Sequence, residues 1–237
     1  MTEIYTYRGD NIEILKERKD KVKSITAKKI IDAYINNAFF GLIIYGRQGI
    51  GKTTYMLKVM YDVYGSWDLV FKHLVFSLDD LVDVIKNDDK RFIVIGWDDA
   101  GIHGHKYRYF RSRESAELIS AWLDAIRTQV SALLITTVNP MNLLKPIRDS
   151  LGFMFGKVTL VNSYGEREIT VYNRTFLPTG ASFVRKSYVE FFSAKLDDNV
   201  YKKYLEMRDA FYKEAKKRLI DALEKYNDEK MREELRD

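Results

Sequence analysis

Apolar residues in the first two thirds of the chain fall into short, unbroken runs separated by segments of helical periodicity. Four of these runs are too short for helices and predict buried strands, at residues 39–45, 73–77, 92–97 and 132–138. Four segments repeat their apolar positions every three or four residues and predict helices, at residues 12–37, 52–64, 78–86 and 114–127. Strands that alternate with helices and are apolar on both faces indicate an α/β fold with a mainly parallel sheet.

The pattern changes after about residue 155. Residues 157–162 and 168–174 flank a short polar segment containing Gly165, which predicts a β-hairpin, and residues 188–192 predict a further strand. From Asp198 onward the chain has a long helical period. We therefore expect residues 1–155 to form a core with an N-terminal helix. Residues 156–237 are expected to add a β-hairpin and a helical extension to the same unit.

The segment from Gly46 to Thr53 carries the most specific chemical signal. It fits the pattern G-x-x-x-x-G-K-[ST] and lies between a predicted strand and a predicted helix, as a phosphate-binding P-loop requires. Its backbone N–H groups and the helix N-terminus would face phosphate oxygens, while Lys52 reaches the β- and γ-phosphates and Thr53 ligates Mg²⁺. The alternative is a glycine-rich turn that binds nothing. The expected nucleotide-binding residues are Gly46, Arg47, Gln48, Gly49, Ile50, Gly51, Lys52, Thr53 and Thr54.

Polar side chains follow two of the other predicted strands. The strand at residues 92–97 ends in Asp98 and Asp99 and resembles a Walker B motif, which implies that Asp98 orients Mg²⁺ and Asp99 activates water. Asp99 stands where such ATPases usually have Glu, so its shorter reach implies slower turnover or a slow switch. The strand at residues 132–138 leads to Asn139, which with Thr137 is a candidate γ-phosphate sensor. The alternatives are a helix-capping role for the aspartates and an Asn-Pro turn.

The composition of the chain excludes several kinds of site and indicates a cellular location. The 237 residues contain no cysteine, which excludes disulfides, thiolate metal sites and a cysteine nucleophile. No apolar run approaches the length of a membrane span, and the first residues are polar, so we expect a cytoplasmic protein with no membrane partner. The net charge of +5 is compatible with a polyanionic partner.

A basic and aromatic segment follows the two aspartates. Its cations would neutralise phosphates and its rings would stack on bases, which favours DNA as the partner, although packing of the rings against a neighbouring subunit is the alternative. The candidate nucleic-acid contacts are Lys106, Tyr107, Arg108, Tyr109, Arg111 and Arg113.

The P-loop, the strand ending in Asp98 and the strand leading to Asn139 together resemble the AAA+ and RecA-like (ASCE) ATPases over residues 39–155. Within that group the chain is most similar to the small replication-initiator and helicase-loader ATPases of archaeal viruses and plasmids. The resemblance implies a three-layer P-loop NTPase core, ATP and Mg²⁺ as cofactors, and a homo-oligomeric active form. It also implies that Arg148 is an arginine finger acting on a neighbour's ATP, with Arg111, Arg113 and Arg127 as alternatives.

These observations predict a DNA-stimulated ATPase that acts in replication initiation, helicase loading or related remodelling. A DNA-packaging or conjugation translocase would share the same core chemistry. A small-molecule kinase would share the P-loop but needs an arginine-bearing lid and a second pocket, which the sequence does not indicate. A scaffold that binds ATP without hydrolysing it is the remaining alternative. No guanine-reading N-K-x-D motif follows the core, which favours ATP over GTP.

Overall fold

The computed structural model describes residues 10–86, 91–100, 126–143, 145–149, 152–161, 165–177, 179 and 181–234. By compactness the chain divides into two units, Met1–Lys195 and Leu196–Asp237. The second unit contains one long helix, α10 (Asp198–Glu234). Among the described residues, the helical elements of the first unit are α1 (Asp10–Lys21), α2 (Ile25–Ile35), α3 (Lys52–Tyr64), α4 (Trp67–Lys72), α5 (Leu78–Lys86), the 3₁₀ helix η1 (Pro140–Asn142) and α9 (Lys145–Asp149). Its strands are β1 (Phe40–Tyr45), β2 (Leu74–Val75), β3 (Ile95–Trp97), β4 (Ala132–Thr137), β5 (Phe153–Leu160), β6 (Glu166–Phe176) and β7 (Ser182–Ser193).

The seven described strands form one mixed sheet in the order β2-β3-β4-β1-β5-β6-β7. The first five strands in this order pair in parallel, and β6 and β7 continue the sheet as an antiparallel hairpin. The predicted α/β fold with a mainly parallel sheet is confirmed. The predicted hairpin of residues 157–162 and 168–174 corresponds to β5 and β6, which pair antiparallel, and the predicted strand at 188–192 lies within β7. The predicted boundary at residue 155 lies inside β5, so the hairpin extends the core sheet directly.

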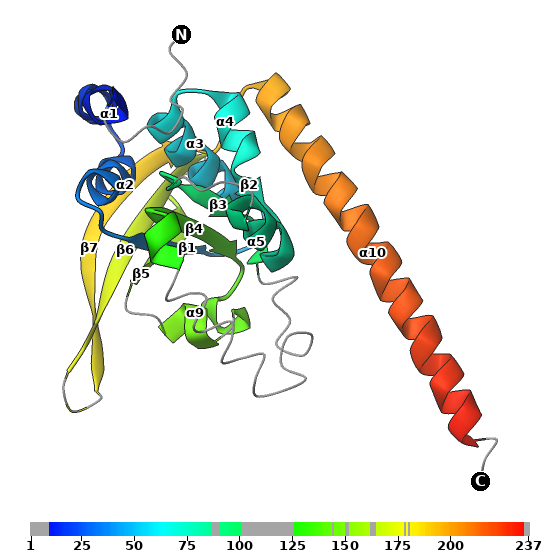
Figure 1. Ribbon diagram of the computed structural model, residues 1–237. Coiled ribbons are helices and arrows are strands. Elements are labelled where there is room, and N and C mark those ends of the chain that lie inside the picture. The colour runs from blue at the N-terminus through cyan, green and yellow to red at the C-terminus, as the bar shows by residue number, and fades with distance from the viewer. Residues whose placement is uncertain are drawn as a thin grey trace. The chain divides into compact units, whose positions relative to one another are not determined.

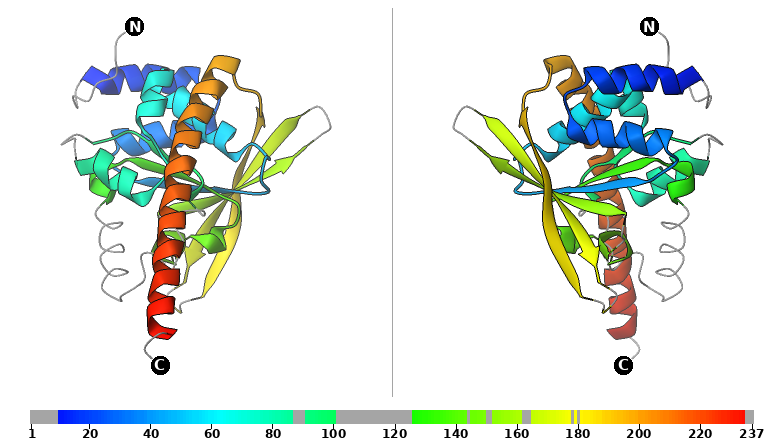
Figure 2. Two further views of the ribbon diagram at one scale, coloured as in Figure 1. Left: turned by 90° about the vertical axis from the view of Figure 1, so that its right-hand side faces the viewer. Right: turned by 90° about the vertical axis from the view of Figure 1, so that its left-hand side faces the viewer.

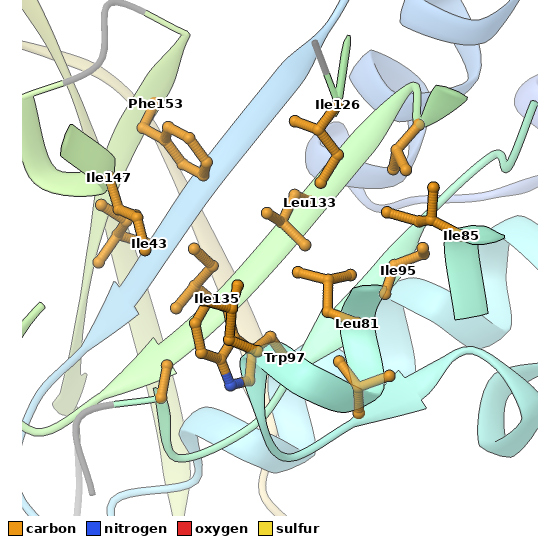
Figure 3. Packing of buried hydrophobic residues seen from close by; sticks show 14 of the residues in the cluster. Ile43, Leu81, Ile85, Ile95, Trp97, Ile126, Leu133, Ile135, Ile147 and Phe153 are labelled. Carbon is orange, nitrogen blue, oxygen red and sulfur yellow. The ribbon is translucent and has the colours of Figure 1, made fainter. Parts of the chain in front are cut away.

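Helices cover both faces of the parallel part of the sheet (Figure 1). On one face α2 and α3 pack on β1 and β4, and α1 lies beside α2 (Figure 2). On that face Gly96 leaves room for α3, since a Cβ atom there would lie 2.6 Å from the sulfur of Met60. On the other face Leu81 and Ile85 of α5 and Ile147 of α9 pack on β-strand residues including Trp97, as Figure 3 shows. The result is a three-layer arrangement with helices on both faces of the sheet.

The predicted elements and the observed ones differ most near the N-terminus and around β2. The helical segment at 12–37 divides into α1 and α2 because the side chain of Ser24 accepts a hydrogen bond from the N–H of Ala27 and starts a new helix. The predicted strand at 73–77 is only two residues long, and α4, which was not predicted, precedes it. Gly65 ends α3 with a left-handed φ of 67°, which allows the sharp turn into α4.

A carboxylate on β7 fastens the hairpin to the helical layer. Glu190 accepts hydrogen bonds from the backbone N–H groups of Ile25 and Thr26, in the first turn of α2, and from the hydroxyl groups of Thr26 and Tyr55. Burial raises the pKa of Tyr55 well above its usual value, and the charge of Glu190 raises it further, so Tyr55 remains a hydrogen-bond donor. The hairpin is thereby held against α2 and, through Tyr55, against α3, the helix that begins at the P-loop.

No described helix combines the length and the apolar character that a membrane span requires.

Candidate functional site

The P-loop occupies the turn between β1 and α3, at the carboxyl end of the parallel strands. Gly46 and Gly51 have φ angles of 150° and 100°, a region that side chains rarely adopt. A Cβ atom on Gly46 would also lie 2.8 Å from the carbonyl oxygen of Val158 on β5. Both the backbone curvature and the close approach of β5 therefore require glycine at the start of the loop.

Lys52, the first residue of α3, folds back over the loop. Its Nζ atom donates hydrogen bonds to the carbonyl oxygens of Gly46, at 3.1 Å, and Arg47, at 3.0 Å. Burial lowers the pKa of Lys52, and the negative charges of Asp99 and Asp98 oppose that shift. The ammonium group thus lies over the phosphate loop in a partly desolvated position, where an anion would stabilise its charged form.

Thr53, Asp98 and Thr136 form a chain of hydrogen bonds beside the loop. The Oδ1 atom of Asp98 accepts from the hydroxyl of Thr53 at 2.9 Å and from the hydroxyl of Thr136 at 2.5 Å. Asp98 is fully buried, so these donors offset the cost of desolvating its carboxylate. The expected metal residues, Thr53 and Asp98, are therefore brought together.

This pair fits Mg²⁺ as it is usually bound beside a nucleotide. Mg²⁺ takes hard oxygen ligands, keeps several waters and needs only one or two protein ligands in addition to phosphate oxygens. A hydroxyl oxygen and a carboxylate oxygen 2.9 Å apart offer that donor set. Within the part of the chain that the structure describes, no group of three or more His, Cys, Asp or Glu side chains could hold a metal ion.

Thr136 was not predicted as a site residue, although it links both aspartates. Besides donating to Asp98, its hydroxyl accepts a hydrogen bond of 2.8 Å from the backbone N–H of Asp99. Asp99 has a left-handed φ of 48°, so this bond holds it in an uncommon backbone conformation. The pairing of Trp97 with Ile135 places Asp98 opposite Thr136. That register is a property of the folded sheet, and a polar residue in an apolar run was the only hint in the sequence.

The two predicted sensor residues make local turn contacts. The Oδ1 atom of Asn139 accepts a hydrogen bond from the N–H of Met141 and caps η1, while the hydroxyl of Thr137 donates to the carbonyl oxygen of Asn139. These are the bonds of the Asn-Pro turn that the sequence left open as an alternative. The residue of β4 that reaches Asp98 is Thr136.

The hairpin completes the P-loop from the opposite side of β1. The Nε atom of Arg167 on β6 donates a hydrogen bond of 3.0 Å to the carbonyl oxygen of Ile50. A Cβ atom on Gly51 would lie 3.3 Å from the Cβ of Ala194, and the ring of Phe192 packs 5.0 Å from that of Tyr55. Next to these contacts is an open pocket of about 490 Å³, lined by Gly165, Glu166, Arg167, Phe191, Phe192, Ser193, Ala194 and Lys195.

Comparison with known proteins gives the family of the chain. It is 30% identical over 222 residues to the uncharacterized protein B-251 of Sulfolobus spindle-shape virus 1, which covers 84% of this chain and 85% of B-251. The chain belongs to the B-251 family. A second viral relative, the uncharacterized protein ORF286 of Acidianus two-tailed virus, is 32% identical over 117 residues, or 48% of this chain and 41% of ORF286.

A solved structure similar to this B-251 family member is the N-terminal domain of zonular occludens toxin from Neisseria meningitidis. Its TM-score is 0.41 and its identity 17%, over 69% of this chain and 97% of that domain. No family model matches the chain. The expected likeness to viral proteins is confirmed, whereas the initiator or loader branch remains a prediction.

The candidate finger and the candidate nucleic-acid contacts are the two remaining sets of predicted residues in this B-251 family member. Arg148, the candidate finger, lies on α9, and its Nη1 atom is 3.5 Å from the sulfur of Met141. The candidate nucleic-acid contacts at residues 106–113 lie outside the described residues.

Proposed function

We propose that the protein binds ATP with Mg²⁺ in the P-loop and hydrolyses it. The observation that carries this proposal is the hydrogen-bonded chain from Thr53 through Asp98 to Thr136, directly beside Lys52. A glycine-rich turn with no ligand has no need for a buried carboxylate oriented by two hydroxyl groups. The choice of ATP over GTP depends on the family resemblance and on the lack of an N-K-x-D motif after the core.

Each site residue has a role that its position supports. Lys52 exchanges its two carbonyl acceptors for β- and γ-phosphate oxygens, and α3 directs its N-terminus at the same anion. Thr53 and Asp98 would hold Mg²⁺, and the ion would supply positive charge to the phosphate oxygens. Asp99 orients the attacking water. The pocket bounded by Arg167 and Lys195 adjoins the P-loop, where Arg167 contacts Ile50, and it is our candidate site for the nucleoside.

The cellular role follows the resemblance and the charge of the chain. We infer an oligomeric ATPase that acts on DNA, in replication initiation, helicase loading or related remodelling. The net charge of +5 and the basic and aromatic residues at 106–113 support a nucleic-acid partner. Arg148 is the proposed finger, supplied to the ATP of a neighbouring copy.

The deciding experiment is steady-state ATP hydrolysis, with and without single- and double-stranded DNA. Lys52→Ala removes the phosphate-binding cation, and Lys72→Ala on α4, where the lysine is exposed, is the matched control. We expect DNA-stimulated turnover in the wild type and in Lys72→Ala, and at least a hundredfold loss in Lys52→Ala. Equal turnover in the two variants would overturn the assignment of the site.

Nucleotide binding measured on the same samples separates the alternatives. Tight ATP binding with negligible turnover, even with DNA, would favour the scaffold. Phosphate that appears on a nucleoside or metabolite would favour a kinase. Turnover that is indifferent to DNA would shift the function to protein remodelling.

A further inference from the structure

A second cavity lies on the other face of the hairpin. Its volume is about 630 Å³, and it opens between η1 and α9 on one side and strands β5, β6 and β7 on the other. Two arginines enter it from opposite walls, Arg148 from α9 and Arg174 from β6. The Nε atom of Arg174 donates a hydrogen bond of 3.3 Å to the hydroxyl of Ser182 on β7.

The lining of this cavity combines cations with aromatic rings. Tyr45 and Tyr172 line it along with the two arginines, and none of the described residues that line it is Asp or Glu. Burial raises the pKa of the Tyr45 phenol, and neighbouring Tyr172 raises it further, so Tyr45 stays neutral and able to donate a hydrogen bond. Met141 and Val184 add apolar surface that is 57% and 60% exposed. The surface is therefore cationic, aromatic and apolar at once.

We propose that this cavity is a binding groove for single-stranded nucleic acid. Arg174 provides a charge for a backbone phosphate, while Tyr172 and the apolar side chains receive unstacked bases. Duplex DNA keeps its base faces stacked inside the helix, so it could use only the cationic part of the groove and would leave the rings without a partner. The inference depends on the proposed function, since it names the polymer on which the ATPase acts.

The groove is continuous with the nucleotide site through the backbone. Tyr45 is the last residue of β1, and Gly46, the first residue of the P-loop, follows it directly. On the other wall the N–H of Met141 is bound by Asn139, which follows β4 and thus lies next to the segment that contacts Asp98. A nucleic-acid strand in the groove would contact Tyr45, which adjoins the P-loop, and Met141, which is bound by Asn139 beside the segment that contacts Asp98. Bound nucleotide is therefore expected to change the affinity for the strand.

The test is binding of a fluorescent oligo-dT by fluorescence anisotropy over a range of salt concentrations. Arg174→Ser removes a charge inside the groove. Arg185→Ser removes the same charge from the same hairpin, but Arg185 follows Val184 on β7, so its side chain points to the opposite face. One neutralised phosphate on a single strand is worth about fivefold in affinity at 0.1 M salt, with a salt slope of about 0.7. We expect that loss in Arg174→Ser and less than twofold in Arg185→Ser.

A ring substitution tests the stacking part of the proposal. Tyr172→Leu keeps apolar bulk but removes the ring, and we expect at least fivefold weaker binding of oligo-dT with an unchanged salt slope. ATP binding and thermal unfolding of each variant show whether it is folded, and they test the nucleotide site independently of the groove. If the wild type fails to bind ATP but binds oligo-dT through Arg174, the proposed ATPase function is refuted while the proposed groove is supported.

Four results would overturn the groove. Equal losses in Arg174→Ser and Arg185→Ser would show a diffuse charge effect, and unchanged affinity in Arg174→Ser and Tyr172→Leu would place the strand elsewhere. A change in sedimentation of Arg174→Ser with unaltered oligo-dT affinity would identify the cavity as a contact between copies of the chain. Preference for duplex over single strand would also contradict the proposal.

Discussion

Replacing Thr136 with valine removes one hydroxyl group and nearly nothing else, so it isolates the bond network around Asp98. Valine has the shape of threonine and suits the buried strand β4, where Thr136 is fully buried. The change removes the donor to the Asp98 carboxylate and the acceptor for the N–H of Asp99. Asp98 still accepts the hydrogen bond from the hydroxyl of Thr53.

The expected cost follows from those two bonds. A hydrogen bond to a charged group contributes about 1.5–3 kcal/mol, and a neutral one about 1 kcal/mol. Thr136→Val should therefore lower the free energy of unfolding by about 2.5–4 kcal/mol. Thr137→Val is the matched control, because the Thr137 hydroxyl makes a single neutral bond of 3.1 Å to the carbonyl of Asn139 and should cost about 1 kcal/mol.

The free energy of unfolding of both variants is measured at pH 7 without nucleotide, by urea unfolding followed by circular dichroism. ATP hydrolysis, measured where both variants are folded, should fall at least tenfold more in Thr136→Val than in Thr137→Val. Equal destabilisation by the two substitutions, or a larger effect of Thr137→Val on turnover, would refute the view that Thr136 orients Asp98.

Three other substitutions test contacts that the hairpin makes. Gly51→Ala places a methyl group at a φ of 100° and 3.3 Å from the Cβ of Ala194, so it should cost about 1–3 kcal/mol in unfolding experiments; a neutral result would show that the loop relaxes freely. Arg167→Ala removes the bond to the carbonyl of Ile50 and should weaken ATP binding several-fold in calorimetry, with Arg185→Ala unaffected. Glu190→Gln turns an amide group toward donors and should lower thermal stability by about 2–3 kcal/mol; an unchanged melting temperature would contradict its anchoring role.

The sequence predicts well whatever depends on neighbouring residues. The P-loop match with its flanking strand and helix is local, and the observed α3 begins and ends where periodicity placed it, at Lys52 and Tyr64. The antiparallel pairing of β5 with β6 follows from the turn residues around Gly165, and the further strand is observed as β7, although β7 is longer than residues 188–192. Local patterns therefore set the element types and most of the boundaries.

Contacts across the sheet could not be predicted in the same way. Thr136 and Thr137 have similar side chains, and only the register of β3 on β4 determines which one meets Asp98. Arg167 reaches the P-loop from a strand 117 positions later, and no periodicity in the sequence connects the two. Pairing of distant strands thus determined the residues that sequence reasoning missed.

The closing of the P-loop by the hairpin also has a consequence for synthesis. When β1, the loop and α3 have emerged from the ribosome, the nascent chain still lacks Arg167, which comes 117 residues after Ile50. It also lacks Ala194, which lies against Gly51 in the folded protein. Ribosomes add about 5–20 residues per second, so the unfinished loop stays without these partners for several seconds or more. We expect nucleotide to become a useful stabilising ligand late in translation, once β7 has joined the sheet.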